Sequence, residues 1–282
     1  MASVAIYYVD GKFVPAEEAV IPVDDLAILR GYGIFDFMRT YHGKPIFLRE
    51  HIERLEHSAS QIGMDLPWSR GELTTIVNQT LAKNSHAESN IRIVVTGGSS
   101  PDFITPQENP RLLVLVTALP KLPAEWYRDG VKIISIDSTR NIPGAKSIDY
   151  IPATIALREA RRHNAIEAVY VDRNGYLLEC TTSNLFVFLG DTLATPGRSI
   201  LSGITRRVVL ELTKGLYSTD IRDIHRDELN EAQEIFITGS NKEIVPVVKV
   251  DDAIIGEGKP GHRTLRIMDA FSTYTTGRAE SA

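Results

Sequence analysis

The sequence predicts a mixed α/β (α+β) fold in two domains, and three observations support this. Segments typical of strands and of helices follow one another without the strict βαβ alternation of a doubly wound sheet. The chain has 282 residues, which is enough for two ordinary domains. The stretch 119–124, LPKLPA, carries two prolines in six residues and is typical of an interdomain linker. We therefore expect a smaller domain at 1–118 and a larger one at 125–282.

Turn residues between apolar runs predict the strands of the first domain. Two hairpins are expected, around Asp10-Gly11 and around His42-Gly43. Their arms are the flanking runs Val4–Val9, Lys12–Val14, Ile34–Tyr41 and Pro45–Leu48. Two more strand candidates, Ile91–Thr96 and Leu112–Ala118, lie on either side of a loop rich in Gly, Ser and Pro.

Two helices are expected between these strands. Apolar residues at spacings of three and four predict the first over Arg49–Ile62. Ser69 and Glu72 have the spacing of a capping box, which predicts a second helix that runs to about Lys83.

The second domain is expected to contain a hairpin, three helices and several further strands. Asn174-Gly175 between two short apolar runs is a strong hairpin signal. Helices are predicted over Ile151–His163, after a cap at Thr205, and over His262–Tyr274. The remaining apolar runs predict strands at Val131–Asp137, Leu185–Leu189, Asp191–Ala194, Glu234–Thr238 and Val245–Val250.

Composition excludes several classes of function. The net charge is −5 and the pI about 5.8, so nothing indicates a nucleic-acid partner or an anionic membrane. No apolar run approaches the ~20 residues of a membrane span, and the N-terminus lacks the pattern of a signal peptide. The single cysteine, Cys180, cannot form an intrachain disulfide, which favours a reducing compartment such as the cytoplasm. No His, Asp or Glu spacing resembles a metal site.

The stretch Asn141–Asn184 contains the most informative chemistry. Lys146 follows a Pro-Gly-Ala turn, and the predicted hairpin can bring Glu179 back toward the segment that holds this lysine. A lysine can supply the amine of a Schiff base, and a carboxylate can keep a pyridinium nitrogen protonated. Spacing alone leaves the alternative that both are solvated surface groups.

Ordered motifs along the chain resemble the signatures of class IV (fold type IV) pyridoxal-phosphate aminotransferases. They read RGYGIFDFMRTYHGKPIFLREHIERL, GAKSIDY, LLECTTSNLF, LSGITR and FITGSNKEIVPV. That group includes branched-chain aminotransferases, D-amino-acid aminotransferases, (R)-selective amine transaminases and aminodeoxychorismate lyase. The resemblance implies a small N-terminal α/β domain, a larger cofactor-binding domain, pyridoxal 5'-phosphate between them, and a homodimer whose partner completes the pocket.

The resemblance also implies roles for individual residues. Lys146 would carry the Schiff base and move a proton, Glu179 would bind the pyridine nitrogen, and Tyr150 could bond the cofactor's phenolic oxygen. The phosphate donors would come from Arg54 and from a helix N-terminus and a turn that follows a strand, namely Ile204, Thr205 and Thr238. His51 and His57, on the helix of Arg54, are expected to be surface residues.

The substrate pocket departs from both familiar patterns. Arg30 stands where branched-chain enzymes have a pocket tyrosine, and Val95-Thr96-Gly97-Gly98 lacks the arginine of the best-known D-amino-acid enzymes. Arg30 and Arg92 are then candidate carboxylate binders, with Ser240 also on the substrate side. The alternative is that the two arginines pair with local acids such as Asp25 or Asp36. The KSID spacing favours D-amino acids with a 2-oxo acid acceptor such as 2-oxoglutarate or pyruvate. Branched-chain L-amino acids, (R)-amines and, more distantly, lyase chemistry remain alternatives.

Overall fold

The computed structural model describes residues 4–281 and divides the chain into two compact units. Unit 1 comprises Met1–Pro120, Gly144–Asp149 and Thr275–Ala282, and unit 2 comprises Lys121–Pro143 and Tyr150–Tyr274. The first division falls inside the expected linker at 119–124. The units are not contiguous in sequence, whereas the expected domains 1–118 and 125–282 are, and those domain boundaries stay a prediction. Within residues 4–281, no helix is both long enough and apolar enough to span a membrane.

Unit 1 is built on a five-stranded antiparallel sheet of order β2-β1-β5-β4-β3. Its strands are β1 Ile6–Val9, β2 Lys12–Pro15, β3 Gly33–Arg39, β4 Ser89–Thr96 and β5 Arg111–Ala118. The first predicted hairpin is confirmed, since β1 pairs with β2. Asp10 and Gly11 have φ values of 45° and 87°, which match the twist of a two-residue hairpin.

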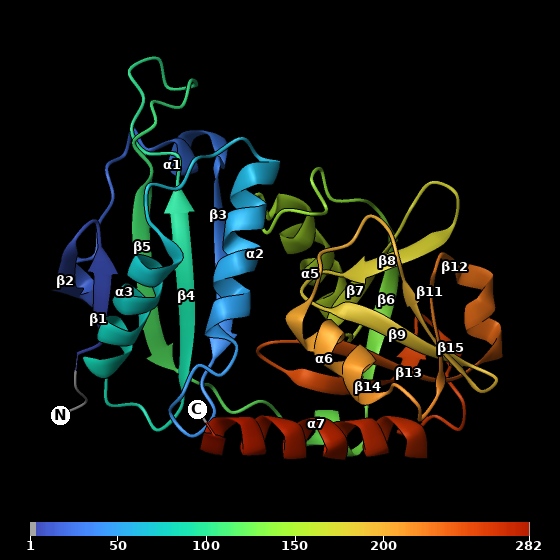
Figure 1. The fold of residues 1–282 in the computed structure, drawn as a ribbon. Helices are drawn as coiled ribbons and strands as arrows, with labels where there is room; N and C mark the ends of the chain where they lie inside the picture. Colours follow the sequence, from blue (N-terminus) through green and yellow to red (C-terminus); the bar gives the residue numbers. More distant parts are fainter. Residues whose placement is uncertain (1–3, 282) are drawn as a thin grey trace. The chain divides into compact units, whose positions relative to one another are not determined.

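Helices α2 (Leu48–Gln61) and α3 (Arg70–Ala82) cover one face of this sheet, as Figure 1 shows. Both predicted helices are confirmed, and Ser69 and Glu72 form the expected capping box. The short helices η1 (Ala16–Glu18) and α1 (Leu26–Arg30) precede β3. The core between helices and sheet is apolar and contains Ile52, Leu55, Leu73, Ile91, Ile93 and Val114.

The second predicted hairpin of unit 1 is wrong in one arm. Tyr41 and Lys44 make an isolated bridge, but the next residues turn directly into α2 instead of forming a strand. The Leu48 N–H donates to the Pro45 carbonyl, and Leu48 is the first residue of the helix. Strand β3 pairs instead with β4, which is remote in sequence, and short-range pattern could not show that pairing.

Unit 2 is built on a ten-stranded mixed sheet of order β11-β10-β9-β13-β14-β6-β7-β8-β12, with β15 beside β14. Its strands are β6 Val131–Asp137, β7 Glu167–Val171, β8 Tyr176–Cys180, β9 Asn184–Leu189, β10 Thr192–Pro196, β11 Ser218–Arg222, β12 Ile224–His225, β13 Ala232–Gly239, β14 Glu243–Val250 and β15 Ala253–Ile254. The predicted β7–β8 hairpin at Asn174-Gly175 is confirmed. Strands β8 and β9 are distant in the sheet order yet contact each other, so the sheet curls.

The helices of unit 2 are α4 Glu125–Arg128, α5 Ile151–Arg162, α6 Ile204–Leu212, η2 Arg226–Glu231 and the first part of α7 His262–Ser281, which belongs to unit 1 from Thr275 onward. The expected cap at Thr205 is wrong: Gly203 is the N-cap of α6, and Thr205 lies in its first turn. The last helix also runs past the predicted end at Tyr274 to Ser281. On the sheet, Phe186 of β9 stacks on Phe236 of β13 with ring centroids 4.8 Å apart. That contact fixes the two strands whose ends carry Asn184 and Thr238.

Candidate active site

Lys146 is anchored in unit 1 by its own backbone. The Phe35 N–H donates to the Lys146 carbonyl at 2.9 Å, and Ile148 N–H donates to the Gly33 carbonyl at 3.0 Å. The segment after the Pro-Gly-Ala turn therefore pairs with the outer edge of β3, which is the last strand of the sheet. The Lys146 N–H also donates to Ser58 Oγ of α2 at 3.0 Å. The half-buried side chain places its Nζ over the Phe35 ring, 4.6 Å from the centroid.

A buried carboxylate holds Arg54 in place. Asp36 accepts from Arg54 Nε and Nη2, each at 2.8 Å, which fixes the plane of the guanidinium. His51 Nδ1 lies 2.6 Å from the same carboxylate and must carry the hydrogen, because a carboxylate can only accept. Asp36 is fully buried. Burial alone would raise the pKa of Asp36, but Arg54 and His51 hold it well below its usual range.

The prediction that His51 is a surface residue is wrong. Its side chain is 2% exposed, whereas His57 on the same helix is exposed. Burial lowers the pKa of His51 more than the attraction of Asp36 raises it, so the imidazole is neutral near pH 7. The sequence pattern missed this because Asp36, its partner, comes from a strand fifteen residues earlier.

In unit 2, Glu179 is buried near the end of β8, and its two carboxylate oxygens accept hydrogen bonds from different groups. Arg140 Nη1 donates to its Oε1 at 3.0 Å, and the Leu201 N–H donates to its Oε2 at 3.1 Å. These contacts fix the plane of the carboxylate. The Tyr170 hydroxyl is buried without a partner among residues 4–281. Burial raises the pKa of Tyr170 to about 12, and the charges of Arg140 and Glu179 also act on it.

The N-terminus of α6 has no side-chain cap and no acidic residue in its first turn. Asn184 Nδ2 donates to the Leu201 carbonyl at 3.0 Å, and an ideal Cβ on Gly203 would lie 1.9 Å from Asn184 Oδ1. Only glycine therefore fits at the N-cap without displacing Asn184. Ile204 and Thr205 open the helix, both buried, and their N–H groups have the character of an anion site.

Thr238 lies opposite Asn184 in the β9–β13 pairing. Its side chain is 1% exposed, and its Oγ1 has no hydrogen-bond partner among the described residues. A buried hydroxyl without a partner costs free energy, so a group that accepts its hydrogen bond would stabilise the site. Ser240 follows in the turn after β13 and is half-buried.

The remaining predicted residues are Tyr150, Arg92 and Arg30. Tyr150 is half-buried at the N-cap of α5. Arg92 on β4 is exposed and stands over the rings of Phe35 and Phe37, at 5.1 and 5.5 Å from the centroids. Arg30 ends α1, and its Nη1 donates to the Leu29 carbonyl at 2.7 Å.

The acids named as alternative partners for those arginines are engaged elsewhere. Asp25 accepts from the Thr96 hydroxyl and the Ala27 N–H, at 2.7 and 2.8 Å. Asp36 is bound by Arg54 as described above. Across residues 4–281, no group of three His, Cys, Asp or Glu side chains could hold a metal ion.

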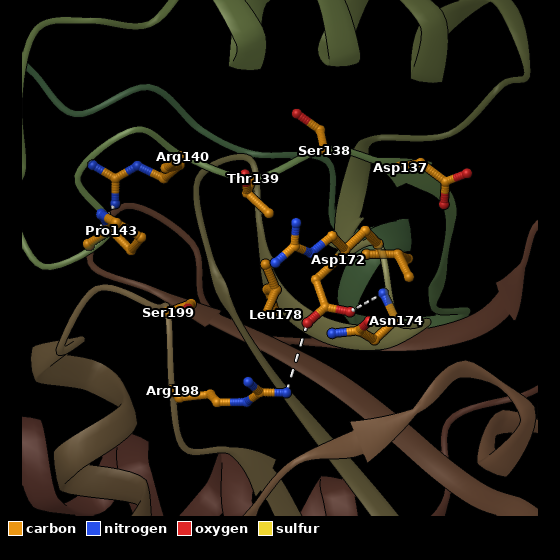
Figure 2. A pocket seen from close by; sticks show the side chains of 12 residues that line it. Asp137, Ser138, Thr139, Arg140, Pro143, Asp172, Asn174, Leu178, Arg198 and Ser199 are labelled. Carbon is orange, nitrogen blue, oxygen red and sulfur yellow. Dashed lines mark hydrogen bonds and ion pairs between the residues drawn. The ribbon is translucent and has the colours of Figure 1, made fainter.

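Unit 2 also has a cavity of about 540 Å³ that reaches Arg140 but not Glu179, Thr205 or Thr238 (Figure 2). Its charged lining is largely paired. Asp172 accepts from the Asn174 N–H at 2.8 Å and lies 3.6 Å from Arg198, which also contacts Asp223. The lining of the cavity therefore carries charges of both signs.

A family model of class IV amino-transferases matches residues 33–250. This chain belongs to the class IV aminotransferase family. The matched region includes Lys146 on the edge of β3, the Asp36–Arg54 pair, and the Glu179 and Thr238 environments described above.

Relatives of this aminotransferase are of two named kinds. It is 33% identical over 279 residues to a putative branched-chain-amino-acid aminotransferase of Methanocaldococcus jannaschii, over 95% of this chain and 96% of that protein. It is 31% identical over 273 residues to a D-alanine aminotransferase of Bacillus licheniformis, over 93% and 94%. The solved branched-chain amino acid aminotransferase of Escherichia coli superposes with a TM-score of 0.88 at 29% identity, covering 98% of this chain and 96% of that one.

Proposed function

We propose that this aminotransferase uses pyridoxal 5'-phosphate, and the buried Thr238 hydroxyl is the observation that carries the proposal. Phosphate oxygens accept hydrogen bonds, and Thr238 Oγ1 is a buried donor without a partner among the described residues. The uncapped N-terminus of α6 adds N–H groups and a favourable dipole. Thr238, Ile204 and Thr205 would bind the phosphate. Arg54 keeps its predicted role there, with its orientation set by Asp36.

Lys146 would hold the cofactor and act as the base. When bound, pyridoxal phosphate supplies an electron-withdrawing ring that stabilises negative charge at the substrate's α-carbon. The Lys146 amine would take the proton from the α-carbon and return it to the C4′ atom of the cofactor. The backbone pairing of Lys146 with β3 and its bond to Ser58 fix where this amine starts from.

Glu179 would accept the hydrogen bond of the protonated ring nitrogen. Arg140 and the Leu201 N–H orient its carboxylate, so the acceptor needs no rearrangement when the ring arrives. Tyr150 would donate to the ring's phenolic oxygen. Arg140 was not predicted from the sequence, because its partner Glu179 lies 39 positions later in the chain.

The substrates we propose are an amino acid, with D-amino acids favoured, and a 2-oxo acid such as 2-oxoglutarate or pyruvate. The spacing after Lys146 and the similarity to D-alanine aminotransferases support this order. Arg92, exposed on the same sheet face as Phe35, and Arg30 would bind carboxylates, with Ser240 on the substrate side. The second candidate is a branched-chain L-amino-acid substrate, which the similarity to branched-chain enzymes supports.

A substrate panel with matched variants tests this proposal. Single turnover of the pyridoxal-phosphate enzyme is measured with D-glutamate, D-alanine, L-leucine and (R)-1-phenylethylamine. Arg92→Ala should slow the acids ~10- to ~100-fold and the amine, which lacks a carboxylate, much less. Strong turnover of L-leucine with none of the D-amino acids would favour the second candidate. Equal losses for acids and amine would show that Arg92 supports structure only.

We also propose a homodimer that works in the cytoplasm. The family resemblance supports the homodimer, and sedimentation at concentrations used for assay would show it. The lone, buried Cys180 supports a reducing compartment. The domain ranges 1–118 and 125–282, joined at 119–124, belong to the same proposal.

A further inference from the structure

Unit 2 contains a buried ion pair between Lys242 and Glu167. Lys242 and Glu167 are 5% and 1% exposed, and Lys242 Nζ is hydrogen-bonded to Glu167 Oε1. The same ammonium donates to Thr182 Oγ1 at 2.8 Å and to Ser183 Oγ at 3.1 Å. All three ammonium hydrogens therefore have an acceptor, which is what a buried cation requires.

Glu167 accepts hydrogen bonds from the turn 181–183, which follows Glu179 in the chain. Its Oε1 accepts from the hydroxyls of Thr182 and Ser183, at 2.5 and 2.9 Å. Its Oε2 accepts from the Thr181 hydroxyl and the Thr182 N–H, at 3.2 and 3.1 Å. One carboxylate on β7 therefore binds every residue of the turn 181–183.

Lys242 belongs to a second turn, which joins β13 to β14. The Lys242 N–H donates to the Gly239 carbonyl at 3.2 Å, and the Lys242 carbonyl accepts from the Tyr127 hydroxyl at 3.1 Å. An ideal Cβ on Gly239 would lie 3.2 Å from the Thr182 carbonyl oxygen, so the two turns are packed together. The Lys242 side chain crosses from one turn to the other.

We propose that Glu167 and Lys242 are positioning residues that set the distance between these two turns. The proposal rests on the proposed function, because one turn continues from Glu179 and the other from Thr238. The ion pair joins the two turns, so it fixes Thr238, the proposed phosphate donor before the second turn, relative to Glu179, the proposed ring acceptor before the first. A hydrogen-bonded ion pair suits this role because its geometry is directional, whereas apolar contacts would allow the turns to slide.

Replacing Lys242 and replacing Glu167 leave different buried groups without their ion-pair partner. Lys242→Met keeps most of the side-chain length, and Glu167 would retain its hydroxyl and N–H donors. Glu167→Gln would leave a buried ammonium without a counter-charge and is expected to impair folding. Lys242→Met is therefore the test variant, and it releases the second turn while the first stays bound.

A matched control is available at the other end of β13. Glu234 is also buried, is contacted by Arg263 Nε at 3.0 Å, and accepts from the Thr264 N–H and hydroxyl at 2.7 Å. Arg263→Met removes a cation from a buried carboxylate that keeps its other donors. The control thus matches the chemistry of Lys242→Met but lies away from both turns.

Cofactor-free wild type, Lys242→Met and Arg263→Met are titrated with pyridoxal 5'-phosphate and with pyridoxal, which lacks the phosphate, while visible absorbance is recorded. We expect Lys242→Met to bind pyridoxal phosphate ~10- to ~100-fold more weakly and pyridoxal only ~3-fold more weakly. Arg263→Met should stay within ~3-fold for both, even if its melting temperature falls equally. Should Lys242→Met fail to fold, Ser183→Ala removes one shared hydroxyl and should weaken pyridoxal phosphate ~3- to ~10-fold.

Three results would overturn the positioning role. If Lys242→Met or Ser183→Ala binds pyridoxal phosphate as tightly as wild type does, the positioning role is refuted and the proposed function stays intact. If Arg263→Met loses as much affinity for pyridoxal phosphate as Lys242→Met does, the loss reflects general destabilisation and not positioning. Wild type that binds no pyridoxal phosphate would refute the proposed function and this inference together.

Discussion

Replacing Asp36 by Asn should expose how strongly the buried network of unit 1 holds Arg54. Asp36 accepts two hydrogen bonds from Arg54 at 2.8 Å and one contact from His51 at 2.6 Å. Asparagine keeps one acceptor oxygen, but its amide nitrogen cannot accept a hydrogen bond, and the Arg54 side chain, only 9% exposed, would lose its counter-charge. Breaking a buried pair from one side costs about 3–5 kcal/mol, a large part of the ~5–15 kcal/mol that stabilises a typical domain.

Urea unfolding of the wild type and of Asp36→Asn measures the loss directly. Glu53→Gln on the same helix is the control, because Glu53 is 33% exposed and its partners Arg49 and Arg70 are largely solvated. That variant should change the free energy of unfolding by less than ~1 kcal/mol. Asp36→Asn should also weaken pyridoxal phosphate binding, since Arg54 loses its fixed plane. A loss no larger than that of Glu53→Gln would refute the buried network as the support of Arg54.

Three further predictions concern pH, the phosphate donors and the N-cap. The pKa of His51 is lower in the folded protein than its ordinary value of 6.5, so acidification protonates the unfolded chain first and stability falls below about pH 6.5. Between pH 7 and 5, the free energy of unfolding should fall less in His51→Gln than in wild type, by up to ~2 kcal/mol. Curves of unfolding free energy against pH that run parallel for the two proteins would contradict this. Thr238→Val should leave the cofactor-free protein as stable or ~1 kcal/mol more stable by thermal melting, yet bind pyridoxal phosphate ~10-fold more weakly; undiminished binding would remove Thr238 from the site. Gly203→Ala should cost ~1–3 kcal/mol in unfolding free energy by forcing Asn184 off the Leu201 carbonyl, and a wild-type value would show that Asn184 relaxes freely.

Local signals in the sequence were sufficient for most elements. The Ser69–Glu72 capping box and the apolar spacing of α2 act within one helix, and both helices lie where they were expected. The Asp10-Gly11 turn needs only its two positive φ angles. Two predictions failed where the partner is remote in sequence: the second arm of the His42-Gly43 hairpin and the exposure of His51. Pro45–Leu48 leads into helix α2 and is not a strand, and β3 pairs with β4, some fifty residues later.

The supporting residues of the site could not be predicted for the same reason. Lys146 and Glu179 stand in motifs that resemble a known family, and so were named from sequence. Asp36 is recognised only when β3 brings it to Arg54 of α2, and Arg140 only when its loop lies beside Glu179 of β8. The pairing of Glu167 with Lys242 joins residues 75 positions apart, and no spacing rule connects them.

The role of Lys146 is tested most directly by locating the cofactor on the chain. Protein loaded with pyridoxal phosphate is reduced with sodium borohydride, digested, and examined by peptide mass spectrometry. We predict a phosphopyridoxyl group on Lys146 in the wild type and no labelled lysine in Lys146→Ala, which should still fold. A label on another lysine, or full transamination by Lys146→Ala, would contradict this role.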